Sequence, residues 1–172
     1  MLSHYKSILY LDLVVVITSR APLISARYQS ALADFIAFNE SFLNPGGVRE
    51  AISEIVAYCG GLAWSPDFYF NTGVFLAGGK VAAKIDVCKV KLFIGRWSEQ
   101  TYLNWLIHNK PFTWKELDRR YNKIAHLRDH LSLAQAYFVH FAGMTSAGRA
   151  NDKNDYTNRN TLIKKYTQEN LQ

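Results

Sequence analysis

Residues 69–77 read Tyr-Phe-Asn-Thr-Gly-Val-Phe-Leu-Ala. An aromatic pair runs into Asn71-Thr72-Gly73 and an apolar segment follows at once, which predicts a buried strand over residues 70–77. The amide, the hydroxyl and the glycine place hydrogen-bonding groups beside a backbone that a ligand can approach closely. Asn-Thr-Gly is also a common turn sequence, so a plain strand-entry turn is the alternative interpretation.

Two more apolar segments predict buried strands. Residues 8–17 carry a nearly continuous run of aliphatic and β-branched side chains, which favours a fully buried, parallel strand, and residues 137–141 form a third run. Helical spacing of apolar residues predicts helices over 25–42, from Val48 to before Gly60, from Ser98 to before Pro111, and over 161–170. Strands that alternate with helices indicate an α/β fold.

The composition is that of a globular protein large enough for one domain. Hydrophobic residues make up 49% and charged residues 20% of the 172 positions, which excludes a disordered chain. The net charge is +6 and the lysines and arginines form no polybasic block, so we expect no nucleic-acid partner. A mild basic excess suits an anionic small substrate or a membrane surface. Two cysteines without metal-type spacing favour a cytoplasmic location.

Four motifs in a fixed order carry a resemblance to a known family. They are Leu-Tyr-Leu-Asp at 9–12, Phe-Asn-Thr-Gly at 70–73, Glu-Gln-x-x-Leu-Asn at 99–104 and His-Phe-x-Gly at 140–143. This order resembles that of nucleotide-sugar glycosyltransferases with the GT-A fold. It is most similar to the family that includes glycogenin and the bacterial lipopolysaccharide galactosyltransferases (glycosyltransferase family 8). The resemblance implies a mixed, mainly parallel sheet flanked by helices.

The resemblance begins late in the pattern of that family. There, strands and loops that hold the nucleotide base and ribose precede the Leu-Tyr-Leu-Asp strand, whereas seven residues precede Ile8 here. We therefore expect a GT-A domain truncated at its N-terminus. Residues 1–147 would be its C-terminal half, and residues 148–172 a polar loop and a terminal helix. Such a chain should expose an apolar flank beside residues 8–17 and self-associate.

The resemblance assigns a divalent cation to Asp12 and His140. In the family, the two acids of an Asp-x-Asp motif and a late histidine hold Mn²⁺ or Mg²⁺, which neutralises the departing nucleoside diphosphate. Asp12 matches the first acid, but Val14 occupies the second position. Ser146 stands where the family often has a lysine that touches the diphosphate. From the residues alone, Asp12 could equally cap a turn, and His140 could be a core histidine.

The same resemblance assigns the sugar site. The residues that would line the sugar pocket are Asn71, Thr72, Gly73 and Gly143. Glu99 and Gln100 match an acid–glutamine pair beside the donor sugar, in which the glutamine stabilises an oxocarbenium-like state, so they are the catalytic candidates. The alternative for Glu99 is an acid in the first turn of a helix, which the helix dipole favours. Asn122 resembles a further family position or closes a turn.

These assignments predict a hexosyltransferase. It would move a sugar from a nucleotide diphosphate, most simply uridine diphosphate (UDP), to a saccharide or lipid-linked acceptor, and its basic charge allows peripheral membrane contact. The alternative is a catalytically inactive glycosyltransferase remnant that acts as a binding or interaction module, because Val14 and Ser146 depart from the family pattern. The sequence leaves open whether the chain is an active enzyme.

Overall fold

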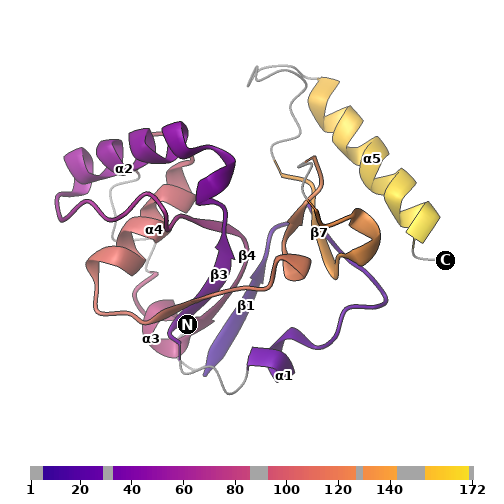
Figure 1. Cartoon of the computed structure of the whole chain (residues 1–172), viewed down its shortest axis with the longest axis horizontal. Helices are drawn as coiled ribbons and strands as arrows, with labels where there is room; N and C mark the ends of the chain where they lie inside the picture. The colour runs from indigo at the N-terminus through magenta and orange to yellow at the C-terminus, as the bar shows by residue number, and fades with distance from the viewer. Residues whose placement is uncertain (1–5, 29–32, 86–92, 127–129, 143–153, 171–172) are drawn as a thin grey trace. The chain divides into compact units, whose positions relative to one another are not determined.

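The computed structural model describes five stretches of the chain, residues 6–28, 33–85, 93–126, 130–142 and 154–170 (Figure 1). The chain folds into two compact units. The first comprises residues 1–10 and 29–117, and the second comprises residues 11–28 and 118–172. Each unit has its own sheet and its own helices, which confirms the predicted α/β class.

The first unit is built on a four-stranded sheet with the order β1-β4-β3-β5. Its strands are β1 (Ser7–Leu11), β3 (Phe35–Asn39), β4 (Phe70–Gly78) and β5 (Trp114–Glu116). Strand β3 runs antiparallel to β4 and parallel to β5, so the sheet is mixed. Strand β4 is buried over nearly its whole length, and this confirms the strand predicted over residues 70–77.

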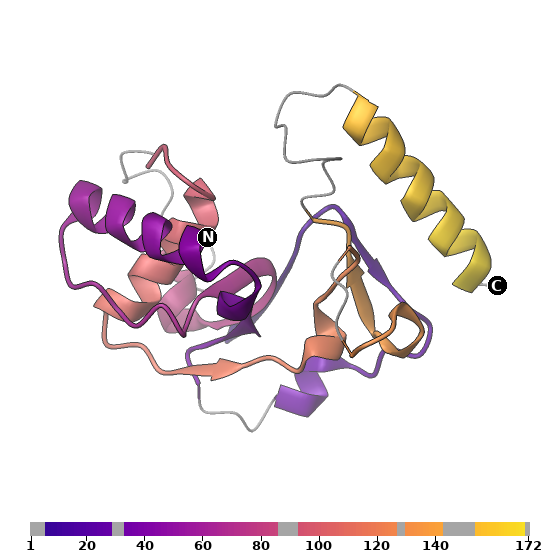
Figure 2. The same ribbon diagram turned by 45° about the horizontal axis from the view of Figure 1, so that its top comes forward.

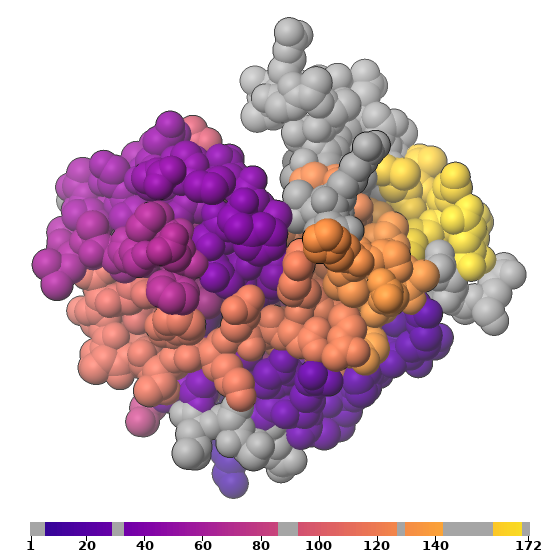
Figure 3. Space-filling view, viewed as in Figure 1, coloured from indigo at the N-terminus to yellow at the C-terminus, as the bar shows by residue number. Residues whose placement is uncertain are grey.

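Two helices, α2 (Pro45–Cys59) and α4 (Ser98–Asn109), pack against each other, and α4 also packs on β4 (Figures 1 and 2). In the space-filling view, violet, magenta and salmon atoms lie together on the surface of this unit (Figure 3). Helix α2 ends at Gly60, whose φ of 71° lies in the left-handed region. Glycine adopts this backbone without a Cβ clash, which explains why Gly60-Gly61 predicts the end correctly.

The short elements of the first unit join these strands and helices. A single turn, η2 (Ser41–Leu43), precedes α2, and α3 (Gly79–Ala82) directly follows β4. The core lies where β3, β4 and α4 meet. Its buried side chains include Phe35, Phe70, Phe75, Leu106 and Ile107. The rings of Phe35 and Phe70 meet edge to face with centroids 5.9 Å apart, a geometry that adds to the effect of burial.

His108, near the end of α4, is enclosed by aromatic rings. Its imidazole stacks on Trp64 at 5.0 Å and on Phe70 at 5.7 Å, and the Trp114 ring lies edge-on at 6.0 Å. The imidazole hydrogen-bonds to the backbone of Phe68, and Nε2 has no hydrogen-bond partner among the described residues. Burial lowers the pKa of His108 to about 4, so the ring is neutral near pH 7.

The second unit is built on a three-stranded sheet with the order β2-β7-β6. Its strands are β2 (Val15–Ile17), β6 (Lys123–Ile124) and β7 (Phe138–His140). Strand β7 runs antiparallel to β2 and parallel to β6. Helix α5 (Asn154–Asn170) is longer than predicted, and its Tyr166 is buried in one cluster with Val139 of β7. Within the described residues, no helix is long and apolar enough to cross a membrane.

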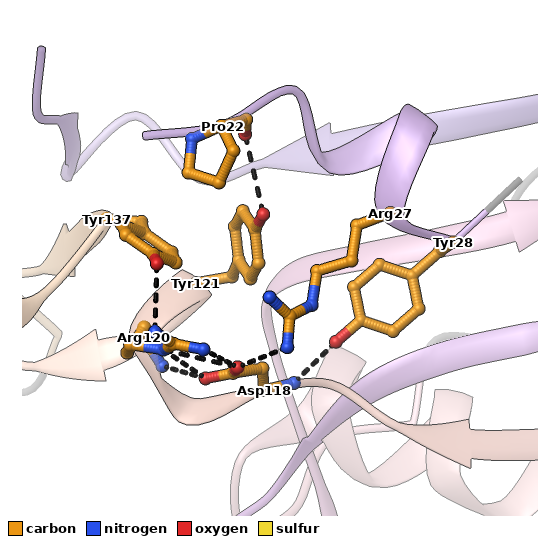
Figure 4. A network of polar contacts seen from close by, with 7 residues as sticks. All are labelled: Pro22, Arg27, Tyr28, Asp118, Arg120, Tyr121 and Tyr137. Carbon is orange, nitrogen blue, oxygen red and sulfur yellow. Dashed lines mark hydrogen bonds and ion pairs between the residues drawn. The ribbon is translucent and has the colours of Figure 1, made fainter. Parts of the chain in front are cut away.

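A network of polar contacts joins α1 (Ile24–Tyr28) to the single turn η4 (Arg119–Tyr121) in the second unit, where η5 (Leu133–Gln135) is a further turn. Figure 4 shows the members of this network: Pro22, Arg27, Tyr28, Asp118, Arg120, Tyr121 and Tyr137. Asp118 accepts hydrogen bonds from Arg27 at 3.0 Å and from Arg120 at 2.6 Å. The bonds from Arg120, with the positive charge of both arginines, hold the pKa of Asp118 below its usual value.

The strand predicted over residues 8–17 is wrong. Strand β1 ends at Leu11, and the Asp12 carbonyl then accepts a hydrogen bond from the Val15 amide at 3.1 Å, which closes a turn. Only residues 15–17 form β2, which belongs to the other sheet and pairs antiparallel with β7. Strand β1 lies at the edge of its sheet rather than in the interior, and 40% of Leu9 and 46% of Tyr10 are exposed.

The helix predicted over residues 25–42 is also wrong. Helix α1 ends at Tyr28, and residues 35–39 form β3. The apolar run from Phe35 to Phe38 is fully buried, because β3 lies between β4 and β5. A strand buried on both faces is apolar at successive positions. A run of four apolar residues therefore also fits one turn of a helix, which explains the wrong prediction.

Candidate functional site

The two residues predicted to bind a metal lie next to each other in the second unit. Asp12 directly follows β1, and His140 is the last residue of β7. The Asp12 Oδ2 and His140 Nε2 atoms are 3.6 Å apart. The imidazole is buried, whereas 44% of the Asp12 side chain is exposed, so solvent reaches the carboxylate. Asp12 also takes part in a turn, the alternative role that the sequence leaves open for it.

Asn122 orients the imidazole of His140. Asn122 follows η4, is buried, and places its Oδ1 3.1 Å from His140 Nδ1. With the amide oxygen toward the ring, this contact fits the tautomer in which Nδ1 carries the hydrogen and the lone pair of a neutral ring lies on Nε2. That lone pair is on the side of Asp12. Partners of this kind on the far nitrogen commonly fix the tautomer of a metal-binding histidine.

The donor atoms of this pair fit a small divalent cation. Two acceptors that face each other at 3.6 Å repel, unless the imidazole is protonated or a cation bridges them. One carboxylate oxygen and one imidazole nitrogen suit Mn²⁺, whereas Mg²⁺ prefers oxygen ligands. Within the described residues, no group of three or more His, Cys, Asp or Glu side chains could hold a metal ion. Val14 packs against the hydrophobic core around Val139 and Phe141.

An interruption of the β3–β4 ladder shapes the polar cluster of the first unit. Ala37 pairs with Phe75, but the next residue, Phe38, pairs with Asn71, so residues 72–74 have no opposite partner on β3. Such bulges leave backbone groups outside the ladder and are common beside functional sites. Here the amides of Thr72 and Gly73 bond to side chains of the cluster instead.

The polar cluster brings Asn71, Thr72 and Gly73 together with Gln100. Gln100 Oε1 accepts a hydrogen bond from the Thr72 amide at 3.3 Å. Asn71 Oδ1 accepts one from the Gly73 amide at 2.9 Å, which is the local bond of a turn. The strand-entry turn and the polar site are therefore both present. Thr72 and Asn71 are buried, and Gln100 is partly exposed in the first turn of α4.

Glu40 lies at the centre of this cluster. It follows β3, and its Oε2 accepts a hydrogen bond from Asn71 Nδ2 at 2.8 Å, while its Oε1 accepts one from Gln100 Nε2. Burial raises the pKa of Glu40, and the bonds from the two amides oppose this shift. Glu40 is not among the predicted site residues, because the sequence predicts a helix over residues 25–42. The available signal is a polar Asn39-Glu40 pair that directly follows an apolar run.

Two further side chains attach α4 to the start of β4. Asn104 Oδ1 accepts from the Phe70 amide at 2.7 Å, and Asn104 Nδ2 donates to the Phe70 carbonyl at 2.8 Å. The Tyr69 hydroxyl lies 2.6 Å from Thr101 Oγ1 and also contacts Gln100. These buried bonds fix the position of α4, and therefore of Gln100, relative to β4. The motif at residues 99–104 contains Asn104, although its role as a docking residue was not predicted.

The other candidates lie apart from the cluster or outside the description. Glu99 is exposed in the first turn of α4, the position that its alternative interpretation gives it, and makes none of the hydrogen bonds of the cluster. Helix α4 begins at Ser98, so Trp97 rather than Ser98 occupies the cap position. Gly143 and Ser146 lie outside the described residues. The metal pair belongs to the second unit and the polar cluster to the first.

Comparison with solved structures finds glycosyltransferases. The galactosyltransferase LgtC, in complex with donor and acceptor sugar analogues, matches 95% of this chain with a TM-score of 0.54 and 17% identity. The bifunctional glycosyltransferase WbbM matches 82% with a TM-score of 0.55 and 16% identity. A glycosyltransferase involved in glycosylation of the major capsid of PBCV-1 matches 94% with a TM-score of 0.50 and 16% identity.

The chain covers only part of each of these longer proteins. The chain spans 64% of the LgtC chain, 29% of WbbM and 68% of the PBCV-1 enzyme. No protein-family model and no curated protein matches the sequence. At these identities the likeness concerns the fold, and it agrees with the fold that the four motifs imply. The chain therefore has the fold of the GT-A glycosyltransferases.

Proposed function

We propose that the chain binds a nucleotide-diphosphate sugar and transfers its hexosyl group to a saccharide or lipid-linked acceptor. The observation that carries this proposal is the approach of Asp12 Oδ2 to His140 Nε2 at 3.6 Å, in a chain with the GT-A fold. Fold alone does not define activity, so the proposal depends on the chemistry of this pair. LgtC, which shares the fold, was solved with donor and acceptor sugar analogues.

Asp12 and His140 would hold Mn²⁺ or Mg²⁺, with Asn122 keeping the imidazole lone pair on Nε2. Such a cation would neutralise charge on the nucleoside diphosphate as the bond to the sugar breaks. The exposed side of Asp12 leaves room for phosphate oxygens and water to complete the coordination. In this proposal the pair binds and orients the leaving group.

The residues of the polar cluster would bind the sugar. Amide groups donate and accept hydrogen bonds, which suits the hydroxyls of a hexose, and Asn71 and Gln100 each offer one amide. The Gln100 oxygen would stabilise positive charge that develops on the sugar. Glu99 is exposed at the start of α4, where a carboxylate can bind a sugar hydroxyl without the cost of burial.

A catalytically inactive binding module is the second candidate, and one observation favours it. Val14 stands where the resembled family has its second acid, and its side chain packs against a hydrophobic core cluster. The described residues therefore supply two ligands to a cation rather than three. A module of this kind would still bind a nucleoside diphosphate or a sugar.

Isothermal titration calorimetry with UDP and Mn²⁺ tests the proposal. We expect wild-type protein to bind UDP with Mn²⁺ and to lose this binding in EDTA. Asp12→Asn should weaken Mn²⁺-dependent binding by about tenfold or more, and Asn122→Ala by roughly tenfold, because both change the ligands or their orientation. Glu169→Gln, an exposed acid of α5 in the same unit, is the matched control and should bind like wild type.

Two outcomes separate the candidates. No heat with millimolar UDP and Mn²⁺ would remove the enzyme and leave a module that binds a sugar without the nucleotide. Binding without release of UDP from any of several UDP-hexoses, with and without saccharide acceptors, would select the inactive module.

Self-association and membrane contact are further parts of this proposal. Leu9 and Tyr10 expose apolar surface on the edge strand β1, and an open strand edge can pair with a second chain. Light scattering should then show species larger than a monomer as concentration rises, and a monomer at every concentration would contradict this. Flotation with vesicles that contain anionic lipid tests peripheral contact, which should disappear at high salt if charge drives it.

A further inference from the structure

We propose that Glu40 is a positioning residue, whose carboxylate sets the orientation of the Asn71 and Gln100 side-chain amides toward a bound sugar. The sugar in this statement rests on the proposed function above, whereas the orientation rests on hydrogen bonds within the first unit. No motif of the sequence assigns a role to Glu40. It enters the site only through the fold, because it follows β3 and thereby lies beside β4 and α4.

Each oxygen of the Glu40 carboxylate serves one amide. Oε2 accepts from Asn71 Nδ2 at 2.8 Å, and Oε1 accepts from Gln100 Nε2. An ionised carboxylate offers only acceptor atoms, so both amides must turn their NH₂ groups toward it. An amide has nearly the same shape when it is rotated by half a turn, so shape alone does not choose between its two orientations.

When the NH₂ groups of Asn71 and Gln100 face Glu40, the positions of their amide oxygens are fixed as well. Asn71 Oδ1 accepts from the Gly73 amide, and Gln100 Oε1 accepts from the Thr72 amide. Both backbone amides are available because residues 72–74 have no partner on β3. If either side-chain amide turned over, its NH₂ group would face a backbone N–H and both bonds of that side chain would be lost. One carboxylate therefore fixes the orientation of two side-chain amides.

An acid at this position is not the simplest way to fill the space. Removing a carboxylate from water costs free energy, and an uncharged side chain would avoid that cost. Asn104 shows the alternative within the same unit, because its amide is fixed by backbone groups of Phe70 and Gln100 and needs no acid. An acid at position 40 is explained if the two amides have to be held in one orientation while a ligand binds.

Side-chain amide NMR of the full chain tests the orientation directly. In Glu40→Gln, the new side chain can accept from one amide, but its own NH₂ group opposes the other. We expect the NH₂ signals of either Asn71 or Gln100 to shift strongly, while those of Asn104 stay in place. Glu40→Asp is the second variant, because a side chain shorter by one methylene cannot reach both amides, and it should disturb at least one of the same two signals.

Unchanged Asn71 and Gln100 signals in both variants would overturn the proposal. Movement of the Asn104 signals together with most of the backbone signals would also overturn it, because Glu40 would then support the fold in general. The expected result leaves the melting temperature and the spectrum outside the cluster close to those of wild type.

A binding measurement tests the connection to the sugar. Glu40→Gln should weaken binding of a UDP-hexose by about tenfold, the effect of one hydrogen bond lost or misdirected, and leave binding of UDP unchanged. Equal weakening of both ligands would overturn the positioning role. Wild-type protein that binds no UDP-hexose would remove the proposed function, and the NMR comparison would still decide whether Glu40 orients the amides.

Discussion

Protonation of His108 should destabilise the first unit as the pH falls from neutral toward 5. Burial between the rings of Trp64 and Phe70 lowers the pKa of His108 to about 4, below its usual value of about 6.5. The unfolded chain therefore binds a proton between these two values that the folded chain does not bind. Folding stability from this group is complete above the unfolded pKa and is lost as the pH decreases.

The size of the effect follows from the two pKa values. Proton linkage gives a loss of about 2 kcal/mol in the free energy of unfolding between about pH 7.5 and pH 5.0, since each unit of pKa difference is worth about 1.4 kcal/mol. This figure is an upper estimate, because partial contact with water screens the charge of the ring.

His108→Phe isolates this effect. A phenyl ring keeps the stacking between Trp64 and Phe70 but does not titrate. The Phe68 carbonyl, which His108 would otherwise share, keeps the Trp64 indole as its donor at 2.9 Å. The pKa of Glu40 is raised, so its contribution to folding stability increases as the pH decreases. The pKa of His126 is lowered, so its contribution decreases over the same change. Both groups are present in both proteins, so the difference between wild type and variant reports His108.

Urea denaturation followed by tryptophan fluorescence is the suitable assay. All four tryptophans, at positions 64, 97, 105 and 114, belong to the first unit, so the signal reports the unfolding of that unit. Wild type should lose up to about 2 kcal/mol more than His108→Phe between the two pH values. A variant that keeps the full pH dependence of wild type would show that another group is responsible. His130→Gln, at an exposed histidine, is the control and should behave like wild type.

Three further changes test the packing around the site. Asn104→Ala should lower the free energy of unfolding of the first unit by roughly 2–4 kcal/mol, because it leaves a buried N–H and C=O of Phe70 unpaired. Urea titration measures this loss, and a loss near zero would mean that water replaces the amide. Gly60→Ala should cost about 1 kcal/mol through its left-handed backbone, whereas Gly46→Ala, equally free of neighbours and without positive φ, should cost nothing in a thermal melt. Asp118→Asn should lower hydrogen-exchange protection of residues 119–124 by about tenfold, because Arg27 and Arg120 lose their charged partner. Unchanged protection would show that the network adds no stability.

The elements that could be predicted from sequence are those whose signals are local. Strand β4, helix α2 and helix α4 each combine a long apolar pattern with a local end signal, such as Gly60 or Pro111. Strand β3 could not be predicted in this way. Its four apolar residues are too few to distinguish two periodicities, and pairing with β4 and β5 decides its structure.

Candidate site residues could be predicted where they stand in such local motifs. Asp12, Asn71, Gln100 and His140 stand in ordered motifs, and the structure places Asp12 beside His140 and Asn71 beside Gln100, each pair within its own unit. Glu40 has no motif around it, and its partners lie 31 and 60 positions away in the sequence. The contact between Asn122 and His140 likewise depends on the pairing of β6 with β7, which single positions do not reveal.

Residues 72–74, which have no opposite partner on β3, divide the pairing of β4 with β3 into two segments. Phe70 and Asn71 are held by one set of partners, and the residues from Phe75 onward are held by another. An added residue between these segments would leave both sets of pairs with β3 in place, whereas the same insertion at Leu76 would turn the following side chains to the opposite face. Evolution can thus lengthen or rewrite the strand where its polar groups gather while the hydrophobic framework stays the same.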